Sequence, residues 1–408
     1  MLRRLWIVSV LLTACLLSNI GHSAGVGPTV ILVSLDAFRW DYAERAATPA
    51  LDSIAAAGVH AKGLIPVFPS KTFPNHYSIV TGLYPENHGI VSNVIYDPEI
   101  DAVFTQGNRE EHGNSHWWGG EPIWVTAEKQ GLTTATLFWP GSEAAVQGIR
   151  PSHWRKMDDS MNYESRVDQI LVWLDLPVEQ RPRFLTLYIE EVNTIGHRYG
   201  PDSPEVIQAV EQVDRLLGKL LSGLAERNMN HSVNLVIVSD HGMAEMDESR
   251  VVFLDDFIDL DHCRVLQAGA VLQLIPKPGL EDQIFSKLEH ASPHMKIYRR
   301  ADLPERLHLK HNSRVTPLVG IPDDGWIIAT RSIENKMQPQ FLRGDHGHDP
   351  KHLSMHGIFY ASGPALKKGI LVDRFESVQV YNLLVSLLNI KAAPNDGNPS
   401  IIEPLLVH

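Results

Sequence analysis

The 408-residue chain is poor in cysteine, with only Cys15 and Cys263. Cys15 falls in an N-terminal segment that has the features of an export signal, so the mature chain would keep one cysteine. A single cysteine excludes an internal disulfide, and the fold must therefore be held by its core. Hydrophobic residues make up 44% of the chain and charged residues 21%, which excludes a disordered chain, a collagen and a coiled coil.

Positive charge is also scarce, because 36 Lys and Arg residues face 48 Asp and Glu residues and leave a net charge of -12. So acidic a chain is a poor match for a nucleic-acid duplex held by a basic face. It can still bind a small anionic substrate if bound metal ions supply the positive charge that the side chains lack.

Long apolar runs are limited to the N-terminus. Arg3 and Arg4 precede an apolar run over residues 5–17, and small and polar residues follow. This order is typical of a signal peptide, and the run is too short to cross a bilayer comfortably. We predict a signal peptide over residues 1–24 and a mature protein without a stable membrane span, periplasmic or secreted. A buried N-terminal helix is the less favoured alternative.

A lipid anchor at Cys15 is the other alternative. Residues 12–15 (LTAC) resemble a bacterial lipoprotein box, but Leu16 and Leu17 continue the apolar run beyond the cysteine. Lipidation at Cys15 is therefore less favoured than cleavage.

Short apolar runs with little alternation recur along the rest of the chain and end in polar residues. They cover residues 29–35, 184–189, 233–239 and 357–361. Helical patterns lie between them, over residues 48–58, 203–224 and 377–389, with Thr48-Pro49 and Ser203-Pro204 as capping signals. The alternation predicts an α/β doubly wound sandwich with a mostly parallel central sheet and helices on both faces.

One stretch differs from this pattern. Residues 251–343 contain short mixed segments and several prolines, without long apolar runs. We therefore predict a main catalytic domain from residues 25–250 and 344–408, with residues 251–343 as a smaller inserted lobe of the same domain.

Metal-ligating residue types follow several of the predicted strands. Asp36, Asp240 and His241 come after two apolar runs, and Asn193 and His197 come after a third. The last two are four residues apart, which places them on one helical face or across one turn. Singly, each residue can be a cap, a turn former or a surface histidine. Together, at the carboxyl ends of parallel strands, they favour a shared site with zinc-like ligands.

Thr72 is the candidate nucleophile. It precedes an apolar helical segment, where backbone N–H groups and the helix dipole favour phosphate. A threonine hydroxyl needs a base or a metal to react. Asn75 lies one turn later, and its amide can donate to a phosphoryl oxygen. The structural alternative for Thr72 is a helix N-cap.

The chain resembles the nucleotide pyrophosphatase/phosphodiesterase family of the alkaline phosphatase superfamily. The resemblance runs from about Val30 to the C-terminus. The matching motifs are residues 35–39 (LDAFR), 69–77 (PSKTFPNHY), 81–90 (TGLYPENHGI), 118–124 (WGGEPIW), 139–143 (WPGSE) and 239–243 (SDHGM).

The resemblance implies an alkaline-phosphatase-like fold and two zinc ions per chain. One ion would be held by Asp36, Thr72, Asp240 and His241, and the other by the residue at position 193 with His197 and His346. It implies a covalent phosphothreonine at Thr72, with Asn75 steadying the developing charge. Phe73 would be one wall of a slot that stacks a nucleotide base.

This chain departs from the family at two functional positions. The family has Asp where this chain has Asn193, which removes a charge from the second zinc site and is expected to weaken it. Glu190 or Glu191 can supply the missing charge, but their spacing from His197 is not that of the family. The second wall of the base slot is a Tyr in the family, and this chain has no Tyr in that region until Tyr163.

The sequence therefore predicts an exported zinc-dependent phosphodiesterase or nucleotide pyrophosphatase that acts on a small phosphorylated substrate. The alternatives are a phosphomonoesterase, a phospholipid-directed phosphodiesterase or a phosphonate hydrolase of the same superfamily. A non-catalytic binding protein on the same scaffold is the alternative from another class. The leaving group and the oligomeric state stay open.

Overall fold

The computed structural model describes residues 27–331 and 342–407. The predicted signal peptide and the lipoprotein box at Cys15 lie outside the described residues. In the described part of the chain, no helix combines the length and apolar character needed to cross a membrane.

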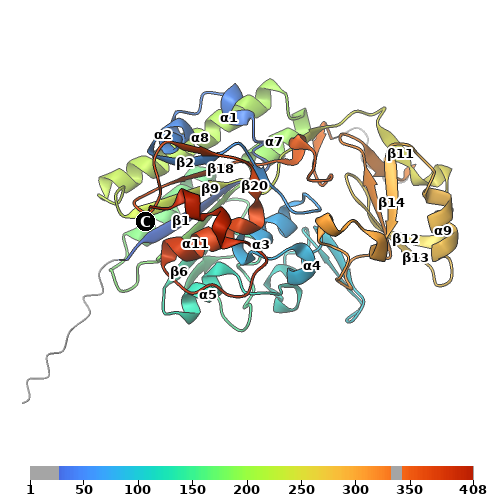
Figure 1. The fold of residues 1–408 in the computed structure, drawn as a ribbon, viewed down its shortest axis with the longest axis horizontal. Coiled ribbons are helices and arrows are strands. Elements are labelled where there is room, and N and C mark those ends of the chain that lie inside the picture. Colours follow the sequence, from blue (N-terminus) through green and yellow to red (C-terminus); the bar gives the residue numbers. More distant parts are fainter. Residues whose placement is uncertain (1–26, 332–341, 408) are drawn as a thin grey trace, which may run out of the picture.

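An eight-stranded sheet forms the centre of the molecule, in the order β19-β2-β18-β9-β1-β8-β6-β7 (Figure 1). Its pairs are parallel except those that β18 makes with β2 and β9. The strands are β1 (Thr29–Leu35), β2 (Gly58–Ala61), β6 (Thr134–Leu137), β7 (His153–Arg155), β8 (Phe184–Ile189), β9 (Val233–Val238), β18 (Phe359–Ser362) and β19 (Ile370–Val372). The predicted α/β class with a mostly parallel sheet is confirmed.

Every residue of β1 is buried, because both faces of the sheet are covered. Val30 and Leu32 pack into one hydrophobic core, and Ile31 and Val33 pack into another on the opposite face. Successive side chains of a strand point to opposite faces, so a continuous apolar run feeds both cores.

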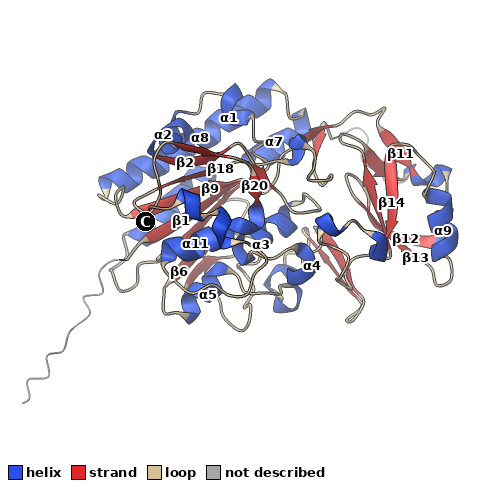
Figure 2. Cartoon of the chain, in the orientation of Figure 1, coloured by secondary structure: helices blue, strands red, loops and turns tan. Residues whose placement is uncertain are grey.

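Helices cover the two faces of the sheet, as Figure 2 shows in blue. One core includes residues of α1 (Tyr42–Arg45), α2 (Pro49–Ala57), α6 (Tyr163–Leu174), α7 (Glu191–Tyr199) and α8 (Pro204–Glu226). The other includes residues of α3 (Thr72–Thr81), α5 (Ile123–Lys129) and α11 (Val380–Leu388). The short helix α4 (Pro85–His88) follows α3.

The two predicted caps behave differently. Ser203 caps α8, because its side chain accepts from the amide of Val206. Thr48 does not cap α2 with its side chain. The buried carboxylate of Asp214 on α8 accepts from the amides of Ala50 and Leu51 instead. A distant carboxylate thus satisfies the first turn of α2, which local sequence could not reveal.

The segment expected to form a lobe has its own four-stranded sheet, in the order β12-β13-β15-β14. The lobe elements are β11 (Val251–Phe253), β12 (Cys263–Gln267), β13 (Leu272–Pro276), α9 (Glu281–Leu288), β14 (Met295–Arg299), β15 (Leu318–Pro322) and β16 (Ile327–Ala329). A separate hydrophobic core, with Leu254, Leu272 and Ile328, holds them together. The domain limits given above stay a prediction.

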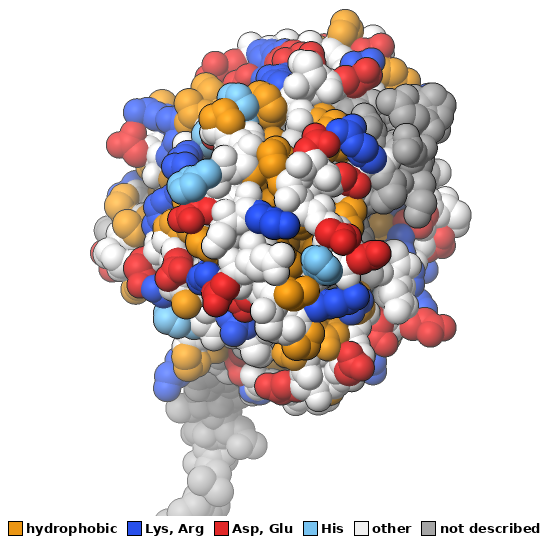
Figure 3. Space-filling model, turned by 90° about the vertical axis from the view of Figure 1, so that its right-hand side faces the viewer, with side chains coloured by type: hydrophobic (Ala, Val, Ile, Leu, Met, Phe, Trp, Pro, Cys, Tyr) orange, Lys and Arg blue, Asp and Glu red, His pale blue; other side chains and the backbone are white. Residues whose placement is uncertain are grey.

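The chain leaves and re-enters the main body at a short antiparallel pair, β10 (Ala244–Glu245) with β17 (Gly344–Asp345). The remaining strands are paired as β3 (Leu64–Ile65) with β20 (Phe375–Glu376) and β4 (Val94–Asp97) with β5 (Ala102–Thr105). On the face of the molecule that carries the lobe, acidic and basic side chains are interspersed and form no single-sign patch (Figure 3).

Candidate active site

The carboxyl ends of three neighbouring strands bring the candidate ligands together. β1 lies between β8 and β9 and is parallel to both. Asp36 follows β1 directly, and Asp240 and His241 follow β9 after Ser239. Gly242 continues this loop where a Cβ atom would lie 2.2 Å from the carbonyl oxygen of Ser354, so the loop needs glycine there.

Asp36, Asp240 and His241 form the first group of candidate metal ligands, with ligand atoms within 4.8 Å of one another. His241 Nε2 lies 3.0 Å from Asp240 Oδ2 and 3.5 Å from Asp36 Oδ1. Asp36 Oδ1 is buried and has no hydrogen-bond partner among the described residues, and buried Asp240 Oδ2 faces only the imidazole nitrogens of His241 and His76 there. Buried anionic oxygens without donors are costly unless a cation satisfies them. The first group therefore fits a metal ion.

The pKa values in this group point the same way. Burial raises the pKa of Asp36 to about 7, and the charge of Asp240 adds to the effect. Burial also opposes the ionisation of Asp240, but His241 and His76 hold the pKa of Asp240 well below its usual range. Two carboxylates held together without a cation thus cannot both ionise freely at neutral pH.

Neighbouring side chains hold the carboxylates of the first group in place. The hydroxyl of Tyr188 donates to Asp36 Oδ2 over 2.5 Å. His76 Nδ1 lies 3.2 Å from Asp240 Oδ2, and His76 Nε2 lies 2.8 Å from the hydroxyl of Ser34. Supporting contacts of this kind are typical of metal sites, where they orient the ligands.

His197, Asp345 and His346 form a second group whose ligand atoms also lie within 4.8 Å of one another. The rings of His346 and His241 stack with centroids 3.6 Å apart, so the two groups adjoin. His197 Nδ1 donates to the carbonyl of Gly344 over 2.7 Å, and His346 Nδ1 donates to that of Ser70 over 2.9 Å. These contacts leave Nε2 of both rings free to bind a metal.

Asn193 lies one turn before His197 on α7, as the spacing predicted. Its Oδ1 atom is buried and has no hydrogen-bond partner in the described chain, which also suits a cation. The alternative that Glu190 or Glu191 supplies the missing charge does not fit the structure. Arg166 holds both oxygens of Glu190, at 2.5 and 2.9 Å, and neither Glu190 nor Glu191 belongs to a candidate ligand group of the described residues.

The carboxylate of the second group is Asp345, which the sequence analysis did not select. Burial opposes its ionisation, but Lys71 lowers the pKa of Asp345 to about 2, so the carboxylate is charged at neutral pH. The sequence signal for Asp345 as a candidate ligand was its position directly before His346. A residue next to a ligand in a bent loop can reach the same ion, as Asp240 and His241 do in the first group.

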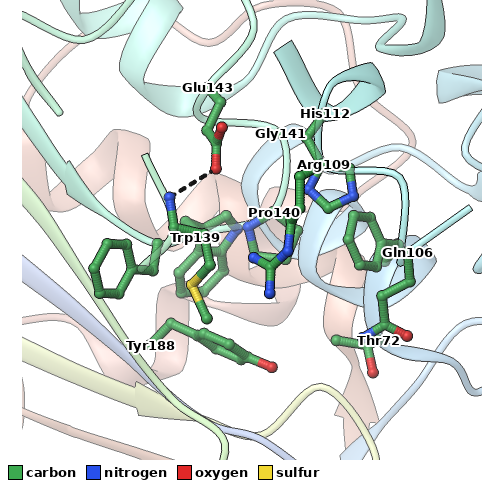
Figure 4. A pocket seen from close by; sticks show the side chains of 12 residues that line it. Thr72, Gln106, Arg109, His112, Trp139, Pro140, Gly141, Glu143 and Tyr188 are labelled. Carbon is green, nitrogen blue, oxygen red and sulfur yellow. Dashed lines mark hydrogen bonds between the residues drawn. The ribbon is translucent and has the colours of Figure 1, made fainter. Parts of the chain in front are cut away.

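Thr72 is the first residue of α3, and Lys71 precedes it as the cap residue. The N-cap alternative for Thr72 is therefore wrong. Thr72 Oγ1 lies 3.4 Å from His241 Nε2. The side chain also lines a pocket, together with Gln106 and Tyr188 (Figure 4). The structure thus places the predicted nucleophile beside the first group, at the N-terminus of α3.

Asn75 does not have the predicted role. Its Oδ1 accepts from the amide of Val67 over 2.7 Å, and its Nδ2 donates to the carbonyls of Pro69 and Lys71 over 3.0 and 2.9 Å. The side chain is fully buried. Its amide is thus committed to the backbone before α3, and Asn75 positions Thr72 rather than contacting substrate.

Asn93 is the amide that lies near the nucleophile. Its Oδ1 accepts from the amide of Phe73 over 2.9 Å, and its Nδ2 makes only a long, exposed contact of 3.4 Å with Gln106. Asn93 lies 21 residues after Thr72 in sequence, and no spacing rule connects the two. Only the folded chain brings this donor to the start of α3.

The two asparagines give a matched pair of variants. We expect Asn75→Ala to lower the free energy of unfolding by roughly 2–4 kcal/mol, because it leaves buried backbone groups unpaired. Asn93→Ala is expected to change stability by less than about 1 kcal/mol, since its contacts are more exposed, and to lower the activity per folded molecule. Denaturant unfolding and initial rates measure both. If the two variants are equally stable and only Asn75→Ala loses activity, Asn75 is the residue that contacts the phosphoryl group, as the sequence predicted.

The pocket beside Thr72 is lined mainly by aromatic and apolar groups, with Arg109 as the cationic side chain among its lining residues. Phe73 and Met157 both line it, and the amide of Met157 donates to Glu143 (Figure 4). Tyr163 does not, because its ring packs under Arg166 at 4.8 Å. The segment that was expected to lack the second tyrosine of the base slot therefore contributes Met157 to the pocket and not Tyr163.

Comparisons with known proteins agree with this geometry. Residues 30–349 match the family model of type I phosphodiesterases/nucleotide pyrophosphatases. Human ectonucleotide pyrophosphatase/phosphodiesterase family member 5 is 37% identical over 98% of this chain and 82% of its own length. Human family member 1 is 39% identical over 93% of this chain, and a venom phosphodiesterase of Crotalus durissus collilineatus is 40% identical over 92%. The chain spans only 42% and 46% of those two proteins.

Solved structures show the same fold. The murine family member 5 superposes with a TM-score of 0.89 at 35% identity, covering 93% of this chain and all of the other. That structure is of an inactive threonine-to-alanine variant in complex with AMP. The human family member 5 has a TM-score of 0.88 at 37% identity over 93% of this chain.

Proposed function

Because the chain belongs to the type I phosphodiesterase/nucleotide pyrophosphatase family, a family of hydrolases, we propose that it hydrolyses phosphodiester or phosphoanhydride bonds of nucleotides. The reaction depends on zinc and proceeds through a phosphothreonine at Thr72. The observation that carries the proposal is the position of Thr72 Oγ1, at the start of α3 and 3.4 Å from His241 Nε2 of the first ligand group.

Two divalent cations suit the two ligand groups, and imidazole with carboxylate ligands favours zinc. The first group, Asp36, Asp240 and His241, would hold one ion together with Thr72. His197 and His346, with Asn193, would contribute to the other. The buried oxygens of Asp36 and Asn193, which have no hydrogen-bond partner among the described residues, support this assignment. Bound zinc supplies Lewis-acid stabilisation of charge on the oxygens that attack and leave phosphorus.

Thr72 performs the covalent step. Its oxygen attacks phosphorus, the bond to the leaving group breaks, and the phosphoryl group with its remaining substituent is transferred to Thr72. Water then cleaves the Thr72–phosphorus bond and restores the hydroxyl. The amide of Asn93 and the backbone N–H of Thr72, the first residue of α3, stabilise negative charge on the phosphoryl oxygens. Tyr188 and His76 hold Asp36 and Asp240 in their orientations.

A nucleotide is the substrate that best suits the pocket. Phe73 offers an aromatic surface beside Thr72, and Arg109 can neutralise part of the substrate's charge. The AMP complex of the murine relative supports a nucleotide ligand. We further propose that the protein is exported, on the basis of Arg3, Arg4 and the apolar run that follows them.

A substrate comparison on zinc-loaded protein tests the proposal. We expect p-nitrophenyl dTMP and ATP to be hydrolysed at least about tenfold faster, in kcat/KM, than p-nitrophenyl phosphate or p-nitrophenyl phosphocholine. The reason is that Phe73 and the pocket contribute binding energy only when a nucleoside is present. A preference for p-nitrophenyl phosphate would identify a phosphomonoesterase, and one for the phosphocholine ester a lipid-directed enzyme. Nucleotide binding without turnover would identify a binding protein.

A further inference from the structure

The second ligand group has a charge problem that the proposed function does not resolve. Asn193 brings a neutral amide oxygen, and His197 and His346 bind metal as neutral imidazoles. Without a carboxylate, a dication at this position would keep its full charge in a buried environment, which is costly. Glu190 cannot supply the charge, because Arg166 holds it.

Asp345 is the carboxylate that reaches this position. One of its oxygens lies within 4.8 Å of a ring nitrogen of both His197 and His346. Asp345 is buried and lies in β17, whose pairing with β10 fixes the backbone on either side. Its Oδ1 also accepts from the amide of His346 over 2.8 Å, which fixes the carboxylate relative to that ligand.

Lys71 is the counter-ion of this carboxylate. Lys71 Nζ lies 3.0 Å from Asp345 Oδ1, and both side chains are nearly buried, at 11% and 12% exposure. The lysine chain passes over Gly347, where a Cβ atom would lie 2.4 Å from Lys71 Cε. Lys71 directly precedes Thr72, so the pair joins the segment of the nucleophile to the loop that carries His346.

We propose that Asp345 supplies the anionic ligand that position 193 lacks, so that the second cation is held by Asp345, His197 and His346 with the neutral oxygen of Asn193. Lys71 is the cation that balances Asp345 when the metal is absent, and it weakens metal binding when the metal is present. The proposal rests on the proposed function, because it takes the second metal site as given.

Calorimetric zinc titration of metal-free protein tests the proposal without measuring activity. We expect Asp345→Asn to weaken the second binding event about 10- to 100-fold, comparable to losing a supporting partner of a metal ligand, and to leave the first event unchanged. Lys71→Met is expected to change the second event in the opposite direction, tightening it about tenfold. Asp349→Asn is the matched control, because Asp349 lies in the same loop but pairs with Arg306.

A double variant separates loss of charge from loss of fold. Asn193→Asp combined with Asp345→Asn moves the carboxylate from β17 to α7 and keeps the total charge. We expect this variant to regain the affinity of the unmodified chain to within about threefold, which a misfolded loop could not do. Thermal unfolding with and without zinc identifies any variant that fails to fold.

The outcomes distinguish this inference from the proposed function. If the unmodified chain binds two zinc ions and Asp345→Asn binds both with unchanged affinity, Asp345 is not a ligand and the inference fails alone. If the unmodified chain binds no zinc, the proposed function fails with it. If Asp345→Asn loses the second ion and the double variant does not recover it, Asp345 acts through the loop rather than as a ligand, and the inference is again wrong.

Discussion

We expect Thr72→Ala to lower kcat by roughly 10⁴-fold or more, as removal of other covalent nucleophiles does. The substitution removes the oxygen that attacks phosphorus and leaves Asp36, Asp240 and His241 in place. Zinc should therefore remain at least partly bound, although the first ion loses Thr72 as a ligand. Thr72 is 3% exposed, so loss of its methyl group leaves a small cavity and a modest loss of stability.

Thr72→Ser is the matched control, since it keeps the hydroxyl and loses only the methyl group. We expect this variant to retain a substantial fraction of the activity and to form a phosphoenzyme that rapid acid quenching and mass spectrometry detect on residue 72. Thr72→Ala should give no such adduct. Retention of more than about a tenth of the activity in Thr72→Ala, with the adduct elsewhere, would exclude the covalent role.

The fold was predictable because its signals are local. The apolar runs at residues 29–35 and 184–189 became β1 and β8 with the same limits, since strands buried on both faces need an unbroken apolar run. The parallel arrangement then required polar residues after the strands to share one edge of the sheet. This rule brought Asp36, Asp240 and His241 together in advance of any coordinates.

The errors arose where a side chain's direction decided its role. Asn75 lies at the predicted place, but its amide turns back to the carbonyls of Pro69 and Lys71. Asn93 and Asp345 depend on contacts between segments that are distant in sequence, such as the 2.9 Å bond from the amide of Phe73 to Asn93. No periodicity encodes such contacts. Position 193 is a different case, since the resemblance predicted a weakened site. The sequence placed Asp345 beside His346, and the folded chain shows that Asp345 also lies near His197.

Removal of the metal ions is expected to have the second large effect on activity. Dialysis against a chelator is expected to lower activity to the level of Thr72→Ala. The hydroxyl of Thr72 has one hydrogen-bond contact among the described residues, with the imidazole of His241, and a free threonine hydroxyl is a weak nucleophile. Zinc should restore the activity in proportion to the ions bound. Magnesium is the control, since it prefers oxygen ligands and should restore little through imidazole nitrogen. Activity that is indifferent to the chelator would exclude the metal-dependent reaction.

The recovery by zinc should also depend on pH, in a direction that Asp36 sets. In the metal-free chain, burial and the neighbouring Asp240 raise the pKa of Asp36 to about 7, so a proton occupies this carboxyl below that pH. Zinc must displace the proton, and its affinity for the first site therefore falls up to about tenfold per pH unit as the pH drops below 7. Above pH 7 the carboxylate is already ionised, and zinc affinity depends little on this group.

At limiting zinc, activity should rise through neutrality to an alkaline plateau, and saturating zinc should shift the rise to lower pH. Asp36→Asn should remove this proton competition while weakening the site at every pH. A pH profile that does not move between limiting and saturating zinc would show that proton release from Asp36 is not linked to metal binding.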